Sequence, residues 1–434
     1  MSRRAGACHD RPVTSRPSPV SPAHADVDER IDRLLTAYPL IDGHNDFPWQ
    51  ARAQTGYDFA RLDIATSLST TSTDLARLRT GRVGAQFWSV FVPSNLPGDT
   101  AVTATLEQVD AVHHLVASYP DDLGFARTAD ELQAVLASGR IASLMGAEGG
   151  QSIGSSLAAL RMLHVLGVRY MTLTHNDNTP WADSATDVPA LGGLSRFGVE
   201  VVREMNRIGM MVDLSHVSPD TMRAALAAAE APVIFSHSSA RGVTHVPRNV
   251  PDDVLETMRV GGGTCMVTFV PEFINEHVAR WRAEAAAAAA QVGVDAKDYV
   301  DFLAFTRARA HDHPKPQATI DDVVRHCEHV REVAGIDHIG IGGDYDGTDT
   351  YPVGLEDVSG YPRLFAALAG RGWSDDDLAK LAGGNTLRVM RDVEAVARDL
   401  ASRRGPSMAT FAELDGGPRL HGPGRRPTQQ SVGD

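Results

Sequence analysis

The chain has few cysteines, no long apolar run and little clustered positive charge, and each scarcity excludes a class of protein. Its three cysteines, Cys8, Cys265 and Cys327, are widely separated in 434 residues. They are too few for a disulfide framework and fit a reducing compartment. No apolar run approaches the roughly 18 residues of a membrane span, and the first residues lack the apolar core of a secretory signal. We therefore expect a cytoplasmic protein without a membrane partner.

The scarcity of positive charge argues against nucleic acid as a partner. The formal net charge is −14, and only three of the 41 Lys and Arg residues are lysines, namely Lys297, Lys315 and Lys380. No basic run is longer than a pair, so no surface segment offers the basic stripe that binds phosphates.

The chain ends differ in composition from the segment between them. Residues 1–26 are rich in Pro and Ser, and residues 403–434 are rich in Gly, Pro, Ser and Arg. Such segments bury little apolar surface, so we expect a disordered leader and a disordered tail. The remaining residues, 27–402, have the length of one large α/β domain.

Eight short apolar runs alternate with helical patterns between these ends. Strands alternating with helices indicate parallel βαβ units, and eight of them predict a (β/α)8 barrel. Residues 271–318 do not fit a minimal barrel, and we interpret them as a helical insertion between strands seven and eight. The expected strands are 39–41, 85–92, 141–145, 169–173, 209–214, 232–235, 263–269 and 338–342.

Six of these runs end in a residue that can bind a metal ion or transfer a proton. A barrel brings the carboxyl ends of all its strands to one rim, where the catalytic groups of such barrels lie. A single histidine at a strand end is usually structural, but a whole set points to a site. The set comprises His44 and Asp46, which a strand would direct to one face, and Glu148, His175, His216, His237 and Asp344.

This set exceeds what one tetrahedral zinc ion requires, so we expect two divalent ions. None of the three lysines lies on an expected strand, which excludes a carbamylated lysine as the bridge between them. A carboxylate must then bridge the ions. Glu148 is the best candidate because the glycines that follow it, Gly149 and Gly150, leave room for two ions.

Several motifs resemble those of the membrane dipeptidase (renal dipeptidase) family of zinc peptidases, in the same order from about residue 31 to residue 396. The resemblance implies a (β/α)8 barrel with two Zn²⁺ ions, bridged by Glu148 and a water or hydroxide. It assigns His44 and Asp46 to one ion, and His216 and His237 to the other. The motifs are Asp42-Gly43-His44-Asn45-Asp46, Glu148-Gly149-Gly150, Thr174-His175-Asn176-Asp177, Ser236-His237-Ser238, Arg248-Asn249-Val250-Pro251 and Gly343-Asp344-Tyr345-Asp346-Gly347.

Three further residues match the family's substrate machinery. By resemblance, His175 stabilises the oxyanion, Arg248 binds the free C-terminal carboxylate of a dipeptide, and Asp344 moves a proton from the attacking water to the departing amine. Other interpretations stay open from the residues alone. Arg248 could form a surface ion pair, His175 could be the structural partner of a metal ligand, and Asp344 could be a plain metal ligand.

The resemblance further implies tolerance for a D-residue at the C-terminal position of the substrate, occasional activity on β-lactams, and a homodimer. Two rival functions remain. One is a binuclear barrel hydrolase that acts on another amide, a lactone or a phosphoester. The other is a metal-dependent binding protein without catalysis, which the presence of every ligand and of Asp344 disfavours.

Overall fold

The computed structural model describes residues 22–296 and 299–416, and a closed parallel barrel forms its centre. The sheet order is β2-β1-β9-β8-β7-β6-β5-β4, and pairing of β2 with β4 closes the ring. The predicted (β/α)8 fold is therefore confirmed. The strands are β1 (Leu40–Asn45), β2 (Val83–Phe91), β3 (Leu123–Phe125), β4 (Ile141–Glu148), β5 (Val168–Thr172), β6 (Met211–Asp213), β7 (Ile234–Phe235), β8 (Thr264–Val267) and β9 (Ile339–Ile341).

The short strand β3 lies outside the ring and was not among the expected strands. It pairs with the first half of β4, from Ile141 to Ser143, whereas β5 pairs with the second half, from Met145 to Ala147. Its three residues include Gly124, so it has neither the length nor the β-branched residues that mark a strand in a sequence.

Helices surround the barrel, and none of those described combines the length and the apolar character that a membrane crossing requires. Local signals set their ends: α6 begins after Ser156, whose hydroxyl accepts a hydrogen bond from Ala159 N, and ends at Gly167 with φ 111°. The helices are α1 (Pro22–Ala37), α2 (Phe47–Thr55), α3 (Leu75–Thr80), α4 (Gly98–Ser118), α5 (Ala129–Ala137), α6 (Leu157–Leu166), α7 (Arg196–Ile208), α8 (Pro219–Ala228), α9 (Asp252–Val260), α10 (Pro271–Ile274), α11 (Glu276–Gln291), α12 (Tyr299–Arg309), α13 (Ile320–Ala334), α14 (Tyr361–Gly370), α15 (Asp375–Ala379), α16 (Asn385–Arg403) and α17 (Phe411–Asp415).

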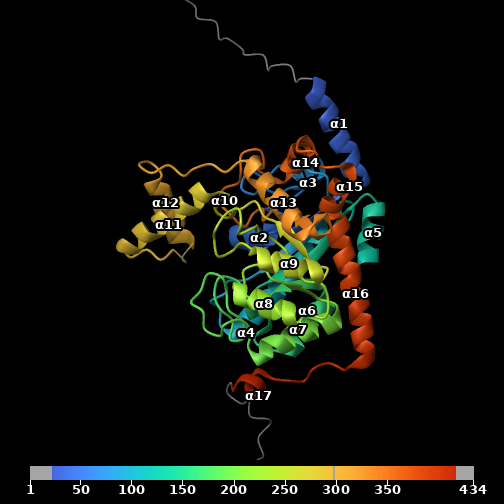
Figure 1. Ribbon diagram of the computed structural model, residues 1–434, viewed down its shortest axis with the longest axis vertical. Coiled ribbons are helices and arrows are strands. Elements are labelled where there is room, and N and C mark those ends of the chain that lie inside the picture. The colour runs from blue at the N-terminus through green and yellow to red at the C-terminus, as the bar shows by residue number, and fades with distance from the viewer. Residues whose placement is uncertain (1–21, 297–298, 417–434) are drawn as a thin grey trace, which may run out of the picture.

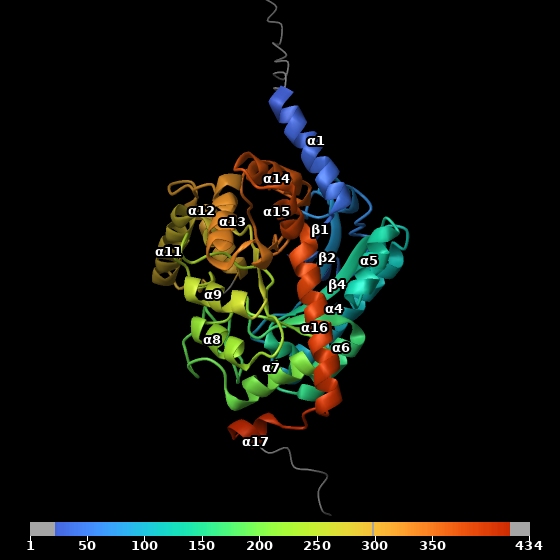
Figure 2. The same cartoon turned by 45° about the vertical axis from the view of Figure 1, so that its right-hand side comes forward.

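The long helix α16 covers one end of the barrel (Figure 2). Its residues Val389, Met390 and Val393 are buried in one cluster with strand residues such as Ile41 and Met211. Both lie near the start of their strands. Apolar side chains thus fill the amino-terminal end, so a substrate must enter at the carboxyl ends of the strands.

The predicted insertion between the last two barrel strands is helical, as expected. Figure 1 shows α11 and α12 side by side at the edge of the molecule, where Ala285, Ala289 and Phe302 form a small core of their own. The segment that returns from the insertion is tied to the loop after β9, since Lys315 Nζ donates to Thr350 Oγ1 at 2.7 Å. That loop carries Asp344, so the insertion borders the rim that the sequence singles out.

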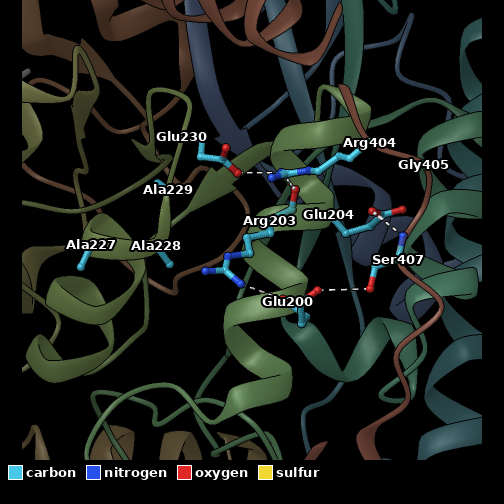
Figure 3. A pocket seen from close by; sticks show the side chains of 10 residues that line it. All are labelled: Glu200, Arg203, Glu204, Ala227, Ala228, Ala229, Glu230, Arg404, Gly405 and Ser407. Atoms are coloured by element: carbon cyan, nitrogen blue, oxygen red, sulfur yellow. Dashed lines mark hydrogen bonds and ion pairs between the residues drawn. The ribbon is translucent and has the colours of Figure 1, made fainter. Parts of the chain in front are cut away.

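The prediction of disordered segments at residues 1–26 and 403–434 is wrong where each segment adjoins the barrel domain. Helix α1 already begins at Pro22, and residues 404–416 cross the outside of the barrel along α7 and end in α17. In Figure 3, Ser407 lies beside Glu200 and Glu204 of α7, and its backbone N–H donates to Glu204 at 3.2 Å. The composition of the tail concealed these contacts. Residues 1–21 and 417–434 lie outside the described residues.

Candidate active site

The predicted ligands and acids meet at the carboxyl rim of the barrel. All are buried except His175, whose side chain is 14% exposed. Sheet closure alone brings these residues together, since they come from six strands spread over some 300 positions. His44 lies within β1, Asp46 just after it, Glu148 at the last position of β4, and His175, His216, His237 and Asp344 two or three residues beyond β5, β6, β7 and β9.

Glu148 lies between two sets of histidines. Its Oε2 is 3.5 Å from His44 Nε2. Its Oε1 is 3.1 Å from His216 Nε2, 3.5 Å from His237 Nε2 and 3.7 Å from His175 Nε2. A carboxylate whose two oxygens face different donor sets has the geometry of a bridge between two cations.

The pairing of His44 with Asp46 has a different cause from the predicted one. Strand β1 ends at Asn45, and Asp46 occupies the position before α2 with φ −95° and ψ 19°. The two side chains therefore converge through the turn that starts the helix, and not through the alternation of a strand. His44 Nε2 lies 3.3 Å from Asp46 Oδ2 and 4.0 Å from Asp344 Oδ1.

The backbone is unusual at the same rim. His216, Asp344 and Asp346 have positive φ values of 66°, 59° and 68°, which non-glycine residues rarely adopt. Such conformations cost about 1–3 kcal/mol each and persist where the surrounding structure enforces them. Hydrogen bonds supply that enforcement here: Asp344 N donates to His44 O at 3.2 Å, and Ala185 N donates to His216 O at 2.7 Å.

Burial and mutual repulsion perturb the charges of the cluster. Burial raises the pKa of Asp344 to about 8. The charge of His44 lowers this pKa, whereas the nearby carboxylates of Asp46 and Glu148 raise it. Burial, reinforced by neighbouring positive groups, lowers the pKa of His216 and of His237 well below the ordinary value. These two imidazoles are therefore neutral, the form in which histidine binds a metal ion.

The residues fit divalent metal ions. Three overlapping groups in the described part of the chain bring ligand atoms within 4.8 Å of one another. Two of the buried atoms, His44 Nε2 and Asp46 Oδ1, have no hydrogen-bond partner there, and a cation would satisfy both. Imidazole and carboxylate donors are the ligands that zinc takes at catalytic sites. The groups are His44, Glu148 and His237; Glu148, His175 and His216; and His44, Asp46 and Asp344.

Arg248 lies beside the cluster with its guanidinium buried, its residue being 3% exposed, so the alternative of a surface ion pair is wrong. Its contacts are weak ones, 3.4 Å to Ser238 Oγ and 3.4 Å to His237 O, and Nε has no partner among the described residues. Phe273 of α10 covers it, with the ring centroid 5.1 Å from Cζ. Burial lowers the pKa of Arg248 to about 10, which still leaves it charged at neutral pH.

Aromatic rings pack around the imidazole of His175. Phe91 packs edge-on against His175 with centroids 4.9 Å apart, and Trp49 packs edge-on against Phe91 at 4.9 Å. The backbone of His175 is fixed by Ser184 Oγ, which donates to its carbonyl at 2.7 Å.

Residues behind the cluster were not assigned a role from the sequence. Asp42 accepts hydrogen bonds from Tyr361 OH at 2.6 Å and Gly343 N at 2.9 Å, and thereby ties β1 to the loop of Asp344. Tyr170 OH contacts His44 Nδ1 at 2.8 Å, and Ser236 contacts His237. A carboxylate inside an apolar strand, as at Asp42, is the one sequence signal that could have indicated them.

The hollow in Figure 3 contains none of the predicted site residues. It has a volume of about 470 Å³ and lies between α7, the end of α8 and the segment after α16. Its charged side chains are all in ion pairs: Arg203 with Glu200 at 3.0 Å, Arg404 with Glu230 at 2.7 Å, and Glu204 with Arg161 and Arg207 outside the hollow. The barrel rim is therefore the stronger candidate for the active site.

A (β/α)8 barrel with imidazole and carboxylate ligands around its carboxyl rim defines a barrel-type metallohydrolase. Residues 28–404 match the family model described as Membrane dipeptidase (Peptidase family M19). The chain belongs to this family and is a metallo-dipeptidase, which confirms the resemblance seen in its motifs.

Individual dipeptidases and metallopeptidases are similar to this chain in sequence or in fold. Dipeptidase verJ of Clonostachys rogersoniana is 42% identical over 376 residues, which cover 84% of this chain and 87% of that protein. Among solved structures, the probable dipeptidase PvdM of Pseudomonas aeruginosa has a TM-score of 0.76 at 23% identity, covering 86% of this chain and 100% of that one. A metallopeptidase of Rhodobacter sphaeroides, liganded with a phosphinate mimic of the dipeptide L-Ala-D-Ala, has a TM-score of 0.68 at 24% identity, covering 82% and 99%. The last two similarities concern the fold.

Proposed function

We propose that this dipeptidase hydrolyses dipeptides with a free C-terminal carboxylate at a site that holds two Zn²⁺ ions. The proposed ligands are His44 and Asp46 for one ion, His216 and His237 for the other, with Glu148 between them. The observation that carries the proposal is that the two oxygens of Glu148 face different histidines, at 3.5 Å and 3.1 Å. A Zn²⁺ pair supplies Lewis acidity and lowers the pKa of water at the site to near neutral.

Arg248 is proposed to recognise the substrate carboxylate. It is a buried guanidinium with no ion pair among the described residues, and such a group gains more from a bidentate carboxylate than an exposed one does. Phe273 keeps water from one face of it. A dipeptide bound here through its C-terminus places its peptide bond toward Glu148 and His175.

Asp344 and His175 are proposed to act on the peptide bond itself. Asp344 Oδ1 lies 4.0 Å from His44 Nε2 at the edge of the cluster, where the carboxylate would take a proton from the attacking water and pass it to the leaving amine nitrogen. Burial lowers the pKa of His175, so its imidazole is neutral and can donate a hydrogen bond to the developing oxyanion.

A D-residue at the C-terminal position is a further part of the proposal. The Rhodobacter sphaeroides protein is known with a mimic of L-Ala-D-Ala, and Arg248 would anchor the carboxylate of either enantiomer. The test compares L-Ala-L-Ala, L-Ala-D-Ala, their C-terminal amides, and a lactone and phosphoester panel. Zinc content and hydrolysis are measured before and after chelation. Hydrolysis of the free dipeptides that is lost with zinc and regained on its return supports the proposal. Preference for the amides, lactones or phosphoesters contradicts it.

A further inference from the structure

A chain of hydrogen bonds reaches from the ring of His237 to a carboxylate that the proposed reaction does not use. His237 Nδ1 lies 2.8 Å from Ser236 Oγ, and Ser236 Oγ donates to Asp213 Oδ2 at 2.6 Å. Asp213 and Ser236 are fully buried, both 0% exposed. Burying a carboxylate costs free energy unless hydrogen bonds compensate. The burial of Asp213 behind His237 therefore suggests that this carboxylate has a role at the site.

Donors surround Asp213 on both oxygens. The backbone N–H groups of Ser215 and Ser236 donate to Oδ1 at 3.1 Å and 2.8 Å. The hydroxyls of Thr172 and Ser236 donate to Oδ2, each at 2.6 Å. These residues come from the ends of the adjacent strands β5, β6 and β7. An ionised carboxylate accepts all four bonds and donates none.

This arrangement fixes the direction of the chain. The Ser236 hydroxyl has one hydrogen, and it is used in the bond to Asp213. The oxygen of Ser236 can then only accept from His237, which places the ring proton on Nδ1. His237 Nε2 is then unprotonated. It lies 3.5 Å from Glu148 Oε1 and can accept a hydrogen bond from His216 Nε2 at 2.9 Å.

We propose that Asp213 is a positioning residue of the metal centre. Acting through Ser236, it selects the tautomer of His237 whose Nε2 can bind a cation, and it holds the ring in the direction of Glu148. This inference rests on the proposed function in that His237 is taken as a ligand. Outer hydrogen-bond partners of this kind orient ligating histidines and raise their basicity.

The other two proposed histidine ligands, His44 and His216, differ from His237 in the hydrogen-bond partner of Nδ1. Tyr170 OH donates to Gly43 O at 3.0 Å and lies 2.8 Å from His44 Nδ1, so it too can accept the Nδ1 proton. His216 Nδ1, by contrast, has no hydrogen-bond partner among the described residues. Two of the three imidazoles therefore have a partner that fixes their tautomer, and only that of His237 ends in a carboxylate.

The substitution Asp213→Asn should reverse the chain. The amide oxygen keeps the two backbone N–H donors, which places the NH₂ group where Oδ2 faces the hydroxyls. The amide then donates to Ser236, and the Ser236 hydrogen turns to His237 Nδ1. The ring proton moves to Nε2 and blocks the atom that would bind the metal. We expect the affinity for Zn²⁺ to fall about 10- to 100-fold.

The test is a Zn²⁺ titration of the full chain, stripped of metal, against a competing chromophoric chelator. D213N is compared with S236A, which removes the link to the ring, and with T172V as a matched control. T172V takes a hydroxyl from the same carboxylate but leaves the link to His237, so its affinity should stay within about threefold of the wild type. Thermal unfolding of each metal-free variant reports whether it is folded.

A second readout needs no metal. Nitrogen-15 NMR of the histidine rings in the metal-free protein distinguishes the two tautomers. We expect Nδ1–H for His237 in the wild type and in T172V, and Nε2–H in D213N.

Each outcome decides between the alternatives. Wild-type affinity and an unchanged tautomer in D213N would overturn the inference, and so would an equal loss of affinity in T172V. If D213N does not fold, S236A decides: a loss of about tenfold supports the role of the chain, and no loss refutes it. If the wild type itself binds no Zn²⁺, the proposed function fails, while the tautomers of D213N and the wild type still decide on Asp213.

Discussion

Asp46 and Asp344 direct their carboxylates to one point, and Gly347 is the residue whose lack of a side chain makes room for both. A Cβ on Gly347 would lie 2.4 Å from Asp46 Oδ2 and 2.4 Å from Asp344 Oδ1. His44 Nε2 faces the same two carboxylates. One ligand group of the proposed centre thus depends on Gly347, which lies three residues after Asp344 at the end of the same motif.

Gly347→Ala should therefore displace at least one of these carboxylates. Because misplacing a reacting group by about 1 Å costs roughly 100-fold, we expect kcat/KM to fall about 10- to 100-fold and the zinc content to decrease. The measurement is steady-state hydrolysis together with metal analysis. Gly370→Ala is the control, since a Cβ there meets no atom within 4 Å; equal behaviour of the two variants would contradict the steric account.

Asp344→Asn separates proton transfer from metal binding. If Asp344 serves as the acid, kcat falls by about 10²- to 10⁴-fold while the zinc content per chain stays at the wild-type value. If it is a plain ligand, as its grouping with His44 and Asp46 would also allow, zinc is lost together with activity. Metal analysis of the purified variant beside its kcat decides which role is correct.

Arg248→Ala should damage mainly the recognition of the substrate. Removing one partner of a buried charge pair costs about 2–5 kcal/mol, so we expect kcat/KM for a free dipeptide to fall at least 30-fold or so. For the same dipeptide with a C-terminal amide, kcat/KM of Arg248→Ala should be close to that of the wild type. Arg248→Lys keeps the charge without the planar fork, so its kcat/KM for the free dipeptide should lie between those of the wild type and Arg248→Ala. An equal loss on the amide would show that Arg248 acts on the structure of the site instead.

The barrel and its rim could be predicted because both follow from regular patterns. Alternating apolar runs and helices predict the topology, and topology alone brings His44, Glu148 and His237 to one place. Asp46 was placed correctly for the wrong reason, since the sequence does not show that β1 ends one residue before it.

The outer residues could not be predicted in the same way. The bond of Ser236 to Asp213 depends on the rotamers of side chains from neighbouring strands, and no periodicity in the sequence encodes a rotamer. The packing of residues 404–416 was hidden because composition alone makes them similar to the tail beyond. Phe411 and Asp415 are the residues whose contacts hold this segment.

The packed C-terminal segment gives a prediction about stability. Asp415 Oδ2 accepts from Phe197 N at 2.9 Å and from Ser195 Oγ at 2.7 Å, at the start of α7. Losing such a cap costs about 1 kcal/mol, so Asp415→Ala should lower the free energy of unfolding by about that amount. Chemical denaturation measures it. Asp399→Ala, which removes only an exposed pair with Arg403, is the control and should change the free energy far less.

His326 of α13 should make the protein less stable in acid. It is fully buried, Ala240 N donates to its Nδ1 at 3.0 Å, and Ile274 O lies 3.3 Å from its Nε2. This pairing requires the neutral ring, and burial lowers its pKa from 6.5 to about 3. Below pH 6.5 the unfolded chain therefore binds a proton that the folded chain does not, and stability present above that pH is lost as the pH falls toward 3.

The size of this effect can be isolated with His326→Gln. At about pH 5, one such histidine costs the folded state about 2 kcal/mol relative to neutral pH. The wild type should therefore lose about that much more unfolding free energy than His326→Gln between about pH 7.5 and pH 5. Urea denaturation at the two pH values measures the difference, with the exposed His311 changed to Gln as the control. If the wild type and His326→Gln lose the same amount, protonation of His326 does not oppose folding, and its burial as a neutral ring would have to be rejected.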